Sequence, residues 1–241
     1  MNLSKIGRIF YGIAIAAIGL LTIYYRRLPY MMIPQKHPWL NDHPIVIYIS
    51  GALLLLTGIA ILIDKKRNQA SLLLATALLS VFLFYFIPYQ LTVSPNAKHF
   101  GDWENAAKEL SLAAGALILA GRRLVPLGIA LFALTIISYS IDHFLYAKEA
   151  AGYVPAWVSH PVTWLYITGA ALFCSGTAIL LNWKRRLAAT LLGTMIFIWV
   201  IILHIPNSLS APLAVNEGEV TSAFLALAYC GIAFVIAGPK N

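Results

Sequence analysis

Residues 48–63 read YISGALLLLTGIAILI, and residues 166–181 read YITGAALFCSGTAILL. Neither stretch holds a charged side chain, and each has two glycines seven residues apart. A helix needs about 20 apolar residues to cross the roughly 30 Å of hydrocarbon in a bilayer. With their apolar neighbours, both stretches are long enough, so the chain is predicted to cross a membrane at these two places.

The composition of the whole chain supports the same prediction. Of its 241 residues, 60% are apolar and 11% are charged, whereas an ordinary soluble domain has about 25% charged residues. This excludes a soluble globule, a disordered chain and a disulfide scaffold. It predicts an all-α membrane protein, because helices satisfy their backbone polar groups internally and the alternating segments of a barrel are absent.

Hydropathy and proline positions divide the chain into eight predicted transmembrane helices. They cover about 6–25, 45–63, 69–90, 102–121, 124–146, 162–182, 187–206 and 219–238. Eleven of the 17 Lys and Arg residues lie at the termini or in the turns near 65, 122 and 185. The positive-inside rule therefore places both termini in the cytoplasm. This clustering also explains the net charge of +8 without a nucleic-acid partner.

The two opening stretches belong to a longer internal repeat. When residues 51–91 are compared with 169–209, 16 of 41 positions are identical without a gap. A shift of 117 residues also aligns Gly101–Gly121 with Gly218–Gly238. We therefore predict two four-helix bundles, residues 1–121 and 122–241. Because four is an even number, the units have the same orientation and are related by an axis along the membrane normal.

These stretches, together with IILHIPNSL at 201–209 and GDWENAAKELSLAAGALILAG at 101–121, resemble the DoxX-like family of integral membrane proteins. The resemblance covers nearly the whole chain as a tandem pair of units. It implies the fold, a bacterial or archaeal cytoplasmic membrane, and a link to quinone chemistry. One difference is that the first unit has Arg26-Arg27 where the second has Asp142-His143, so a role for His143 does not transfer to the first unit.

The fourth predicted helix contains charged residues inside the apolar zone. Glu104 and Lys108 have the i, i+4 spacing of a helical ion pair. Glu109 lies deeper and needs another partner, for which we expect Arg26 or Arg27 from the first helix. The sequence leaves two interpretations open, a polar site or an ion pair that only holds the helices together.

The second unit has different polar residues near the same membrane boundary. Asp142 and His143 end the fifth predicted helix, and His204 ends the seventh. Two imidazoles at similar depth suit a quinone carbonyl better than haem or a metal ion, and local hydrogen bonding is the simpler alternative.

The resulting hypothesis is a small-ligand-binding or accessory subunit with a polar site in the outer leaflet. The candidate ligand-binding residues are Arg26, Arg27, Glu104, Lys108, Glu109, Asp142, His143 and His204. The alternatives are a structural or assembly subunit and a small-solute or proton-coupled carrier. Lipid, and a membrane-protein partner or a second copy of the chain, are the expected contacts. The sequence contains no catalytic motif such as GxGxxG or HExxH, which argues against an enzyme.

Overall fold

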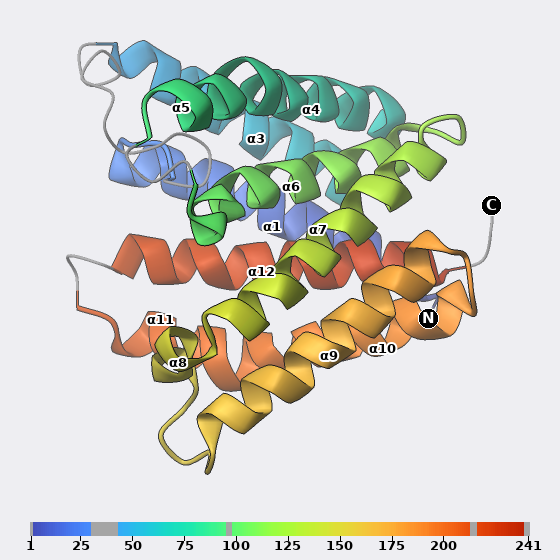
Figure 1. The fold of residues 1–241 in the computed structure, drawn as a ribbon. Helices are drawn as coiled ribbons and strands as arrows, with labels where there is room; N and C mark the ends of the chain where they lie inside the picture. The colour runs from blue at the N-terminus through green and yellow to red at the C-terminus, as the bar shows by residue number, and fades with distance from the viewer. Residues whose placement is uncertain (1, 30–42, 95–97, 213–215, 239–241) are drawn as a thin grey trace.

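The computed structural model describes residues 2–29, 43–94, 98–212 and 216–238, and every regular element in these ranges is helical (Figure 1). The long uninterrupted helices are α1 (Leu3–Tyr25), α3 (Pro44–Leu62), α6 (Glu104–Ala120), α7 (Val125–Leu145), α9 (Pro161–Leu180) and α12 (Asn216–Ala237). Two further helices change their winding part-way, and each consists of three consecutive segments. The first is made of α4 (Arg67–Val81), η1 (Phe82–Phe86) and α5 (Ile87–Thr92). The second is made of α10 (Arg185–Trp199), η4 (Val200–His204) and α11 (Ile205–Ser210). Lys240 is one of the eleven basic residues at the termini or in turns on which the topology prediction rests, and it lies outside the described residues.

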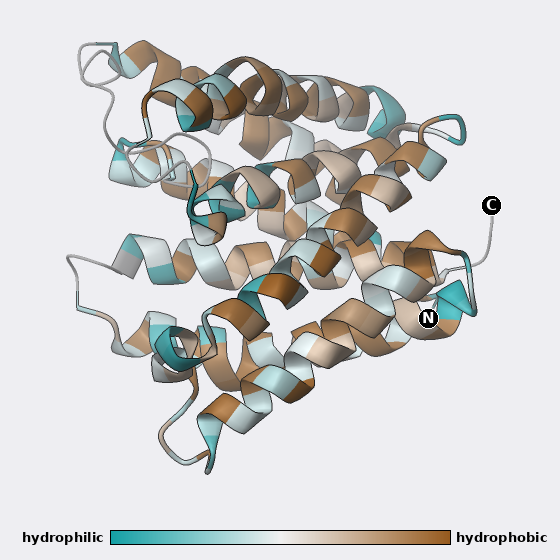
Figure 2. Cartoon of the chain, viewed as in Figure 1, coloured by the Kyte–Doolittle hydropathy of each residue, from teal (hydrophilic) through white to brown (hydrophobic). Residues whose placement is uncertain are grey.

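Seven helices in the described ranges are long and apolar enough to cross a membrane, as Figure 2 shows by their hydropathy. This confirms a multi-pass helical membrane protein. The remaining predicted span, the fourth at about 102–121, corresponds to α6, which has 17 residues and is therefore about 25 Å long. It lies among the others with Glu109 and Leu112 through Leu119 buried.

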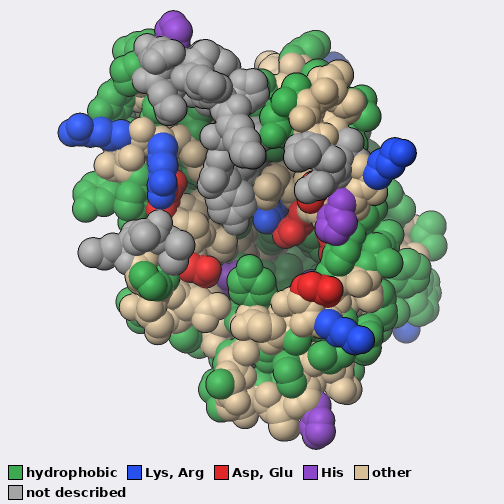
Figure 3. Space-filling view, turned by 60° about the vertical axis from the view of Figure 1, so that its left-hand side comes forward, with side chains coloured by type: hydrophobic (Ala, Val, Ile, Leu, Met, Phe, Trp, Pro, Cys, Tyr) green, Lys and Arg blue, Asp and Glu red, His purple; other side chains and the backbone are tan. Residues whose placement is uncertain are grey.

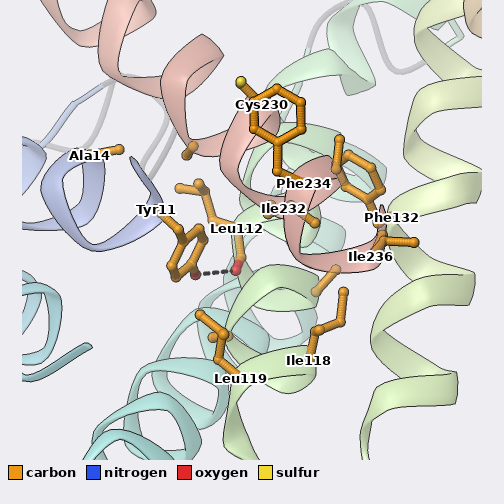
Figure 4. Close-up of a cluster of buried hydrophobic side chains, with 14 of the residues drawn as sticks. Tyr11, Ala14, Leu112, Ile118, Leu119, Phe132, Cys230, Ile232, Phe234 and Ile236 are labelled. Carbon is orange, nitrogen blue, oxygen red and sulfur yellow. Dashed lines mark hydrogen bonds between the residues drawn. The ribbon is translucent and has the colours of Figure 1, made fainter. Parts of the chain in front are cut away.

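The long helices form a closed ring. Each helix packs against the next one along the chain, in the order α1, α3, α4, α6, α7, α9, α10 and α12, and α12 packs back against α1. The helices α6 and α12 also touch across the ring. Residues from α1, α6, α7 and α12 form a shared apolar core, part of which Figure 4 shows.

The two changes of winding have the same local cause. Pro88 follows the π-helical segment η1, and Pro206 follows η4. A proline ring clashes with the carbonyl four residues earlier, which is Phe84 or Ile202. The wider π turn relieves this clash while the helix continues to its end.

The turns that join α3 to α4 and α9 to α10 also share a conformation. Asp64 and Lys66 have positive φ angles of 62° and 53°. Asn182 and Lys184, each 118 residues later, have φ angles of 56° and 43°. These turns lie at the end of the bundle where α1 begins and α12 ends, and α5, α8 (Ala147–Ala150) and α11 lie at the opposite end (Figure 1).

Candidate ligand-binding site at one end of the bundle

The first turns of α6 bring a pair of opposite charges to the end of the bundle that carries α8. The Lys108 Nζ lies 3.0 Å from the Glu104 Oε1 and donates to the Asn105 Oδ1 at 3.3 Å. The pair predicted from the i, i+4 spacing is therefore confirmed. The Lys108 side chain is largely buried, whereas that of Glu104 is half-exposed, so the ammonium group is the part of the pair that faces the interior.

Asp142 on α7 completes a charged group with this pair. Glu104, Lys108 and His99 all act on the Asp142 carboxyl group electrostatically. Both carboxyl oxygens of Asp142 are buried, and neither has a hydrogen-bond partner among the described residues. A buried carboxyl group without donors is costly. Asp142 is therefore the group in this cluster that has acceptor capacity left for a ligand.

His143 is held in a fixed orientation by two contacts. Its Nδ1 lies 2.8 Å from the Tyr139 carbonyl oxygen, and its ring stacks on Trp199 of α10 at 6.2 Å between centroids. A carbonyl oxygen only accepts hydrogen bonds, so Nδ1 carries the hydrogen. In the neutral ring, Nε2 is then an acceptor. The contact with Tyr139 is a local hydrogen bond of the kind that the sequence analysis gave as the simpler alternative to a ligand-binding role.

Two tyrosines and a second histidine bring α12 and η4 into the cluster. The hydroxyl groups of Tyr139 and Tyr229 lie 3.0 Å apart, which links α7 to α12. Lys108 also acts electrostatically on His204 in η4. The structure thus gathers Glu104, Lys108, Asp142, His143 and His204 into one region, which we call the polar cluster together with Tyr139 and Tyr229. Figure 3 is turned toward this end and shows charged and His side chains around a hollow in the surface.

Three of the predicted site residues lie elsewhere. Arg27 forms an ion pair with Glu217 in the first turn of α12, and Arg26 is an exposed residue at the end of α1. Glu109 is fully buried and has no hydrogen-bond partner among the described residues. The expected pair of Glu109 with Arg26 or Arg27 is therefore wrong, because the closed ring places Glu217 beside the end of α1.

The arginines also differ from Asp142 and His143 in their place on the helix. Arg26 lies just past the last residue of α1, whereas Asp142 and His143 lie inside the last turn of α7. The two sequence positions that seemed to correspond therefore do not occupy equivalent places.

An apolar groove of about 570 Å³ lies between α11 and α12. Its lining includes Val200, Ile205, Val220 and Phe224. Tyr229 follows Val220 by nine residues, which is about two and a half helical turns, so the two side chains leave α12 on opposite faces. Tyr229 therefore faces away from the groove, whereas His204 lies in η4 between the lining residues Val200 and Ile205.

Sequence reasoning missed several contributors to these contacts. Three aromatic residues could not be told from ordinary core residues by sequence alone, namely Tyr139, Tyr229 and Trp199. They meet the rest of the cluster only because the helices pack in a ring. Within the described ranges, no three His, Cys, Asp or Glu residues are grouped so that they could hold a metal ion. No protein-family model, curated protein or solved structure matches this chain.

Proposed function

We propose that the protein binds a small ligand of the quinone class in the polar cluster, as a binding or accessory subunit of a cytoplasmic membrane. The observation that carries this proposal is the convergence of α6, α7, α12 and η4 on one region with buried donors and acceptors. Lys108 and the tyrosine pair supply donors, whereas Asp142 and His143 supply acceptors. A quinone presents carbonyl acceptors, and its reduced form presents hydroxyl donors, so this set of groups suits both forms.

The proposed architecture is a tandem pair of four-helix units with eight membrane crossings, related to the DoxX-like family. Support comes from backbone features that recur 118 residues apart, namely the positive-φ turns at Lys66 and Lys184 and the π segments η1 and η4. The order of the helices in the ring is also the same for each unit. In this architecture α6, extended by η2 (Phe100–Trp103), makes the fourth crossing.

The proposed topology leads to a labelling prediction. The variant carries Cys174→Ser and Cys230→Ala, which remove the native thiols, and Lys66→Cys, which adds one thiol in the turn after α3. A membrane-impermeant thiol reagent added outside intact cells is expected not to modify this thiol. The reason is that the basic turn at Lys66 lies on the cytoplasmic side. The same reagent added to opened membranes should modify it. Strong labelling of intact cells would reverse the proposed orientation.

The ligand proposal is tested on the purified full-length protein. Lipid extraction and mass spectrometry should find a copurified quinone, and a short-chain ubiquinone analogue should bind in titration. Lys108→Met removes a charged donor, so we expect it to weaken binding of the analogue by about tenfold or more. Asp142→Asn should also alter the affinity because it replaces an acceptor-only group by an amide.

The matched control is Asp64→Asn, which changes a half-exposed carboxylate at the opposite end of the bundle. It should leave binding unchanged. Equal affinity in the wild type, Lys108→Met and Asp142→Asn would contradict the ligand proposal. If these two variants lower thermal stability while the wild type binds no quinone, the cluster has the structural role that the sequence left as an alternative.

A further inference from the structure

Glu109 is the most isolated acidic group in the described part of the chain. Its side chain is fully buried, and both carboxyl oxygens lack a hydrogen-bond partner. It lies five residues into α6, which places it about 7.5 Å along the helix from Glu104. Lys108 is its neighbour in sequence, but the Lys108 ammonium group pairs with Glu104.

Among the described residues, no Lys or Arg side chain forms an ion pair with Glu109: Arg67 pairs with Asp64, and Arg8 donates to the Ile61 and Leu62 carbonyl oxygens. The elements packed against this part of α6 carry the following titratable or charged groups: Lys5, Arg8, Tyr11, Tyr24 and Tyr25 on α1, Arg67 on α4, Tyr85 in η1, Asp102 in η2, Tyr139, Asp142 and His143 on α7, and Glu217, Glu219, Tyr229 and Cys230 on α12. Of these, Tyr11 has an electrostatic interaction with Glu109. The Tyr11 hydroxyl donates its hydrogen to the Leu112 carbonyl oxygen at 2.6 Å (Figure 4), so this hydrogen is not donated to the Glu109 carboxyl group.

The surroundings of Glu109 select a proton rather than a metal ion as its ligand. Hard metal cations require several oxygen ligands in one place, and the described residues form no group of three or more His, Cys, Asp or Glu side chains that could hold a metal ion. An ionised carboxylate buried without a cation or donors is strongly unfavourable. A bound proton removes this charge and needs no other ligand.

The carboxyl group is also not needed to build the helix. In the 117-residue alignment, Glu109 corresponds to Ala226, which is buried on α12. The two helices also touch each other across the ring. A small apolar side chain therefore packs at the corresponding place, and the carboxyl group of Glu109 is an addition to an otherwise apolar core.

We propose that Glu109 is a proton-binding site in the interior of the bundle, occupied when the helices are packed. The proton leaves only when water reaches the carboxyl group, so its release is coupled to opening of the core around α6. This site is separate from the polar cluster and does not depend on a ligand binding there.

Infrared spectroscopy of the full-length protein in detergent tests this proposal. The wild type at neutral pH should show the carbonyl band of a protonated carboxylic acid, and labelling of glutamate carboxyl groups with ¹³C should shift it. The band should disappear in Glu109→Gln and persist in the control Glu104→Gln. Absence of the band in the wild type, or its persistence in Glu109→Gln, would overturn the proposal.

A stability measurement provides a second test on the same variants. As the pH rises from neutral to alkaline, the wild type must either keep its proton or bury a charge, whereas Glu109→Gln cannot ionise. The Tm of the wild type should therefore fall relative to that of Glu109→Gln. A constant difference across this pH range would contradict a proton bound at Glu109. If Glu109→Gln does not fold, Glu109→Ala, which copies Ala226, replaces it in both measurements.

Discussion

Replacement of Gly231 by alanine is expected to lower the free energy of unfolding by about 1–3 kcal/mol, the usual cost of overpacking a close contact. Gly231 on α12 faces Gly7 on α1 where these two helices close the ring. A Cβ atom at position 231 would lie 2.7 Å from both the Gly7 carbonyl oxygen and the Tyr11 backbone nitrogen. Because both neighbours are backbone atoms, a rotamer change cannot relieve the clash and the helices must move apart.

The matched control for this variant is Gly152→Ala. A Cβ atom at Gly152 would meet no atom within 4 Å, so the control changes the same residue type without a steric cost. Thermal unfolding in detergent should show a clear loss of Tm for Gly231→Ala and little change for Gly152→Ala. Equal Tm values for Gly231→Ala and the wild type would mean that α1 and α12 are not tightly packed at this crossing.

Much of the fold could be predicted from the sequence because hydropathy and proline positions act locally. The predicted span at about 187–206 agrees with a helix that runs from Arg185 to Ser210, although the sequence did not predict its π segment. The shorter α6 is different, since its first turns contain Glu104 and Lys108 and its apolar part is brief. The ring itself depends on contacts between distant segments, which hydropathy does not encode.

The candidate site could be predicted only where the contributing residues are near one another in sequence. The Glu104–Lys108 pair follows from helical spacing, and Asp142 and His143 follow from their place at a helix end. The partner of Arg27 could not be found in this way, because Glu217 is 190 residues away and meets Arg27 only when α12 packs beside α1. The same is true of Tyr139 and Tyr229, which meet across 90 residues.

Arg8 provides the second large expected effect, at the opposite end of the bundle from the polar cluster. Its guanidinium group is buried and donates to the carbonyl oxygens of Ile61 at 2.6 Å and Leu62 at 2.9 Å. These carbonyls belong to the last turn of α3, where helical carbonyls have no partner in the helix and a positive charge is favourable. Arg8 also lies 3.6 Å from the Asp64 carboxylate in the following turn.

Arg8→Met is therefore expected to lower the free energy of unfolding by about 2–4 kcal/mol, because it removes two charged hydrogen bonds and the ion pair with Asp64. Lys5→Met is the matched control, since Lys5 is exposed on the same helix and its change should stay within about 0.5 kcal/mol. Arg8→Lys should recover part of the stability, because an ammonium group keeps the charge but lacks the second guanidinium nitrogen, which in Arg8 lies 3.6 Å from the Asp64 carboxylate. Chemical denaturation in detergent measures all three variants. If Arg8→Met were as stable as Lys5→Met, water rather than Arg8 would be satisfying the end of α3, and the tight turn at Asp64 would need another explanation.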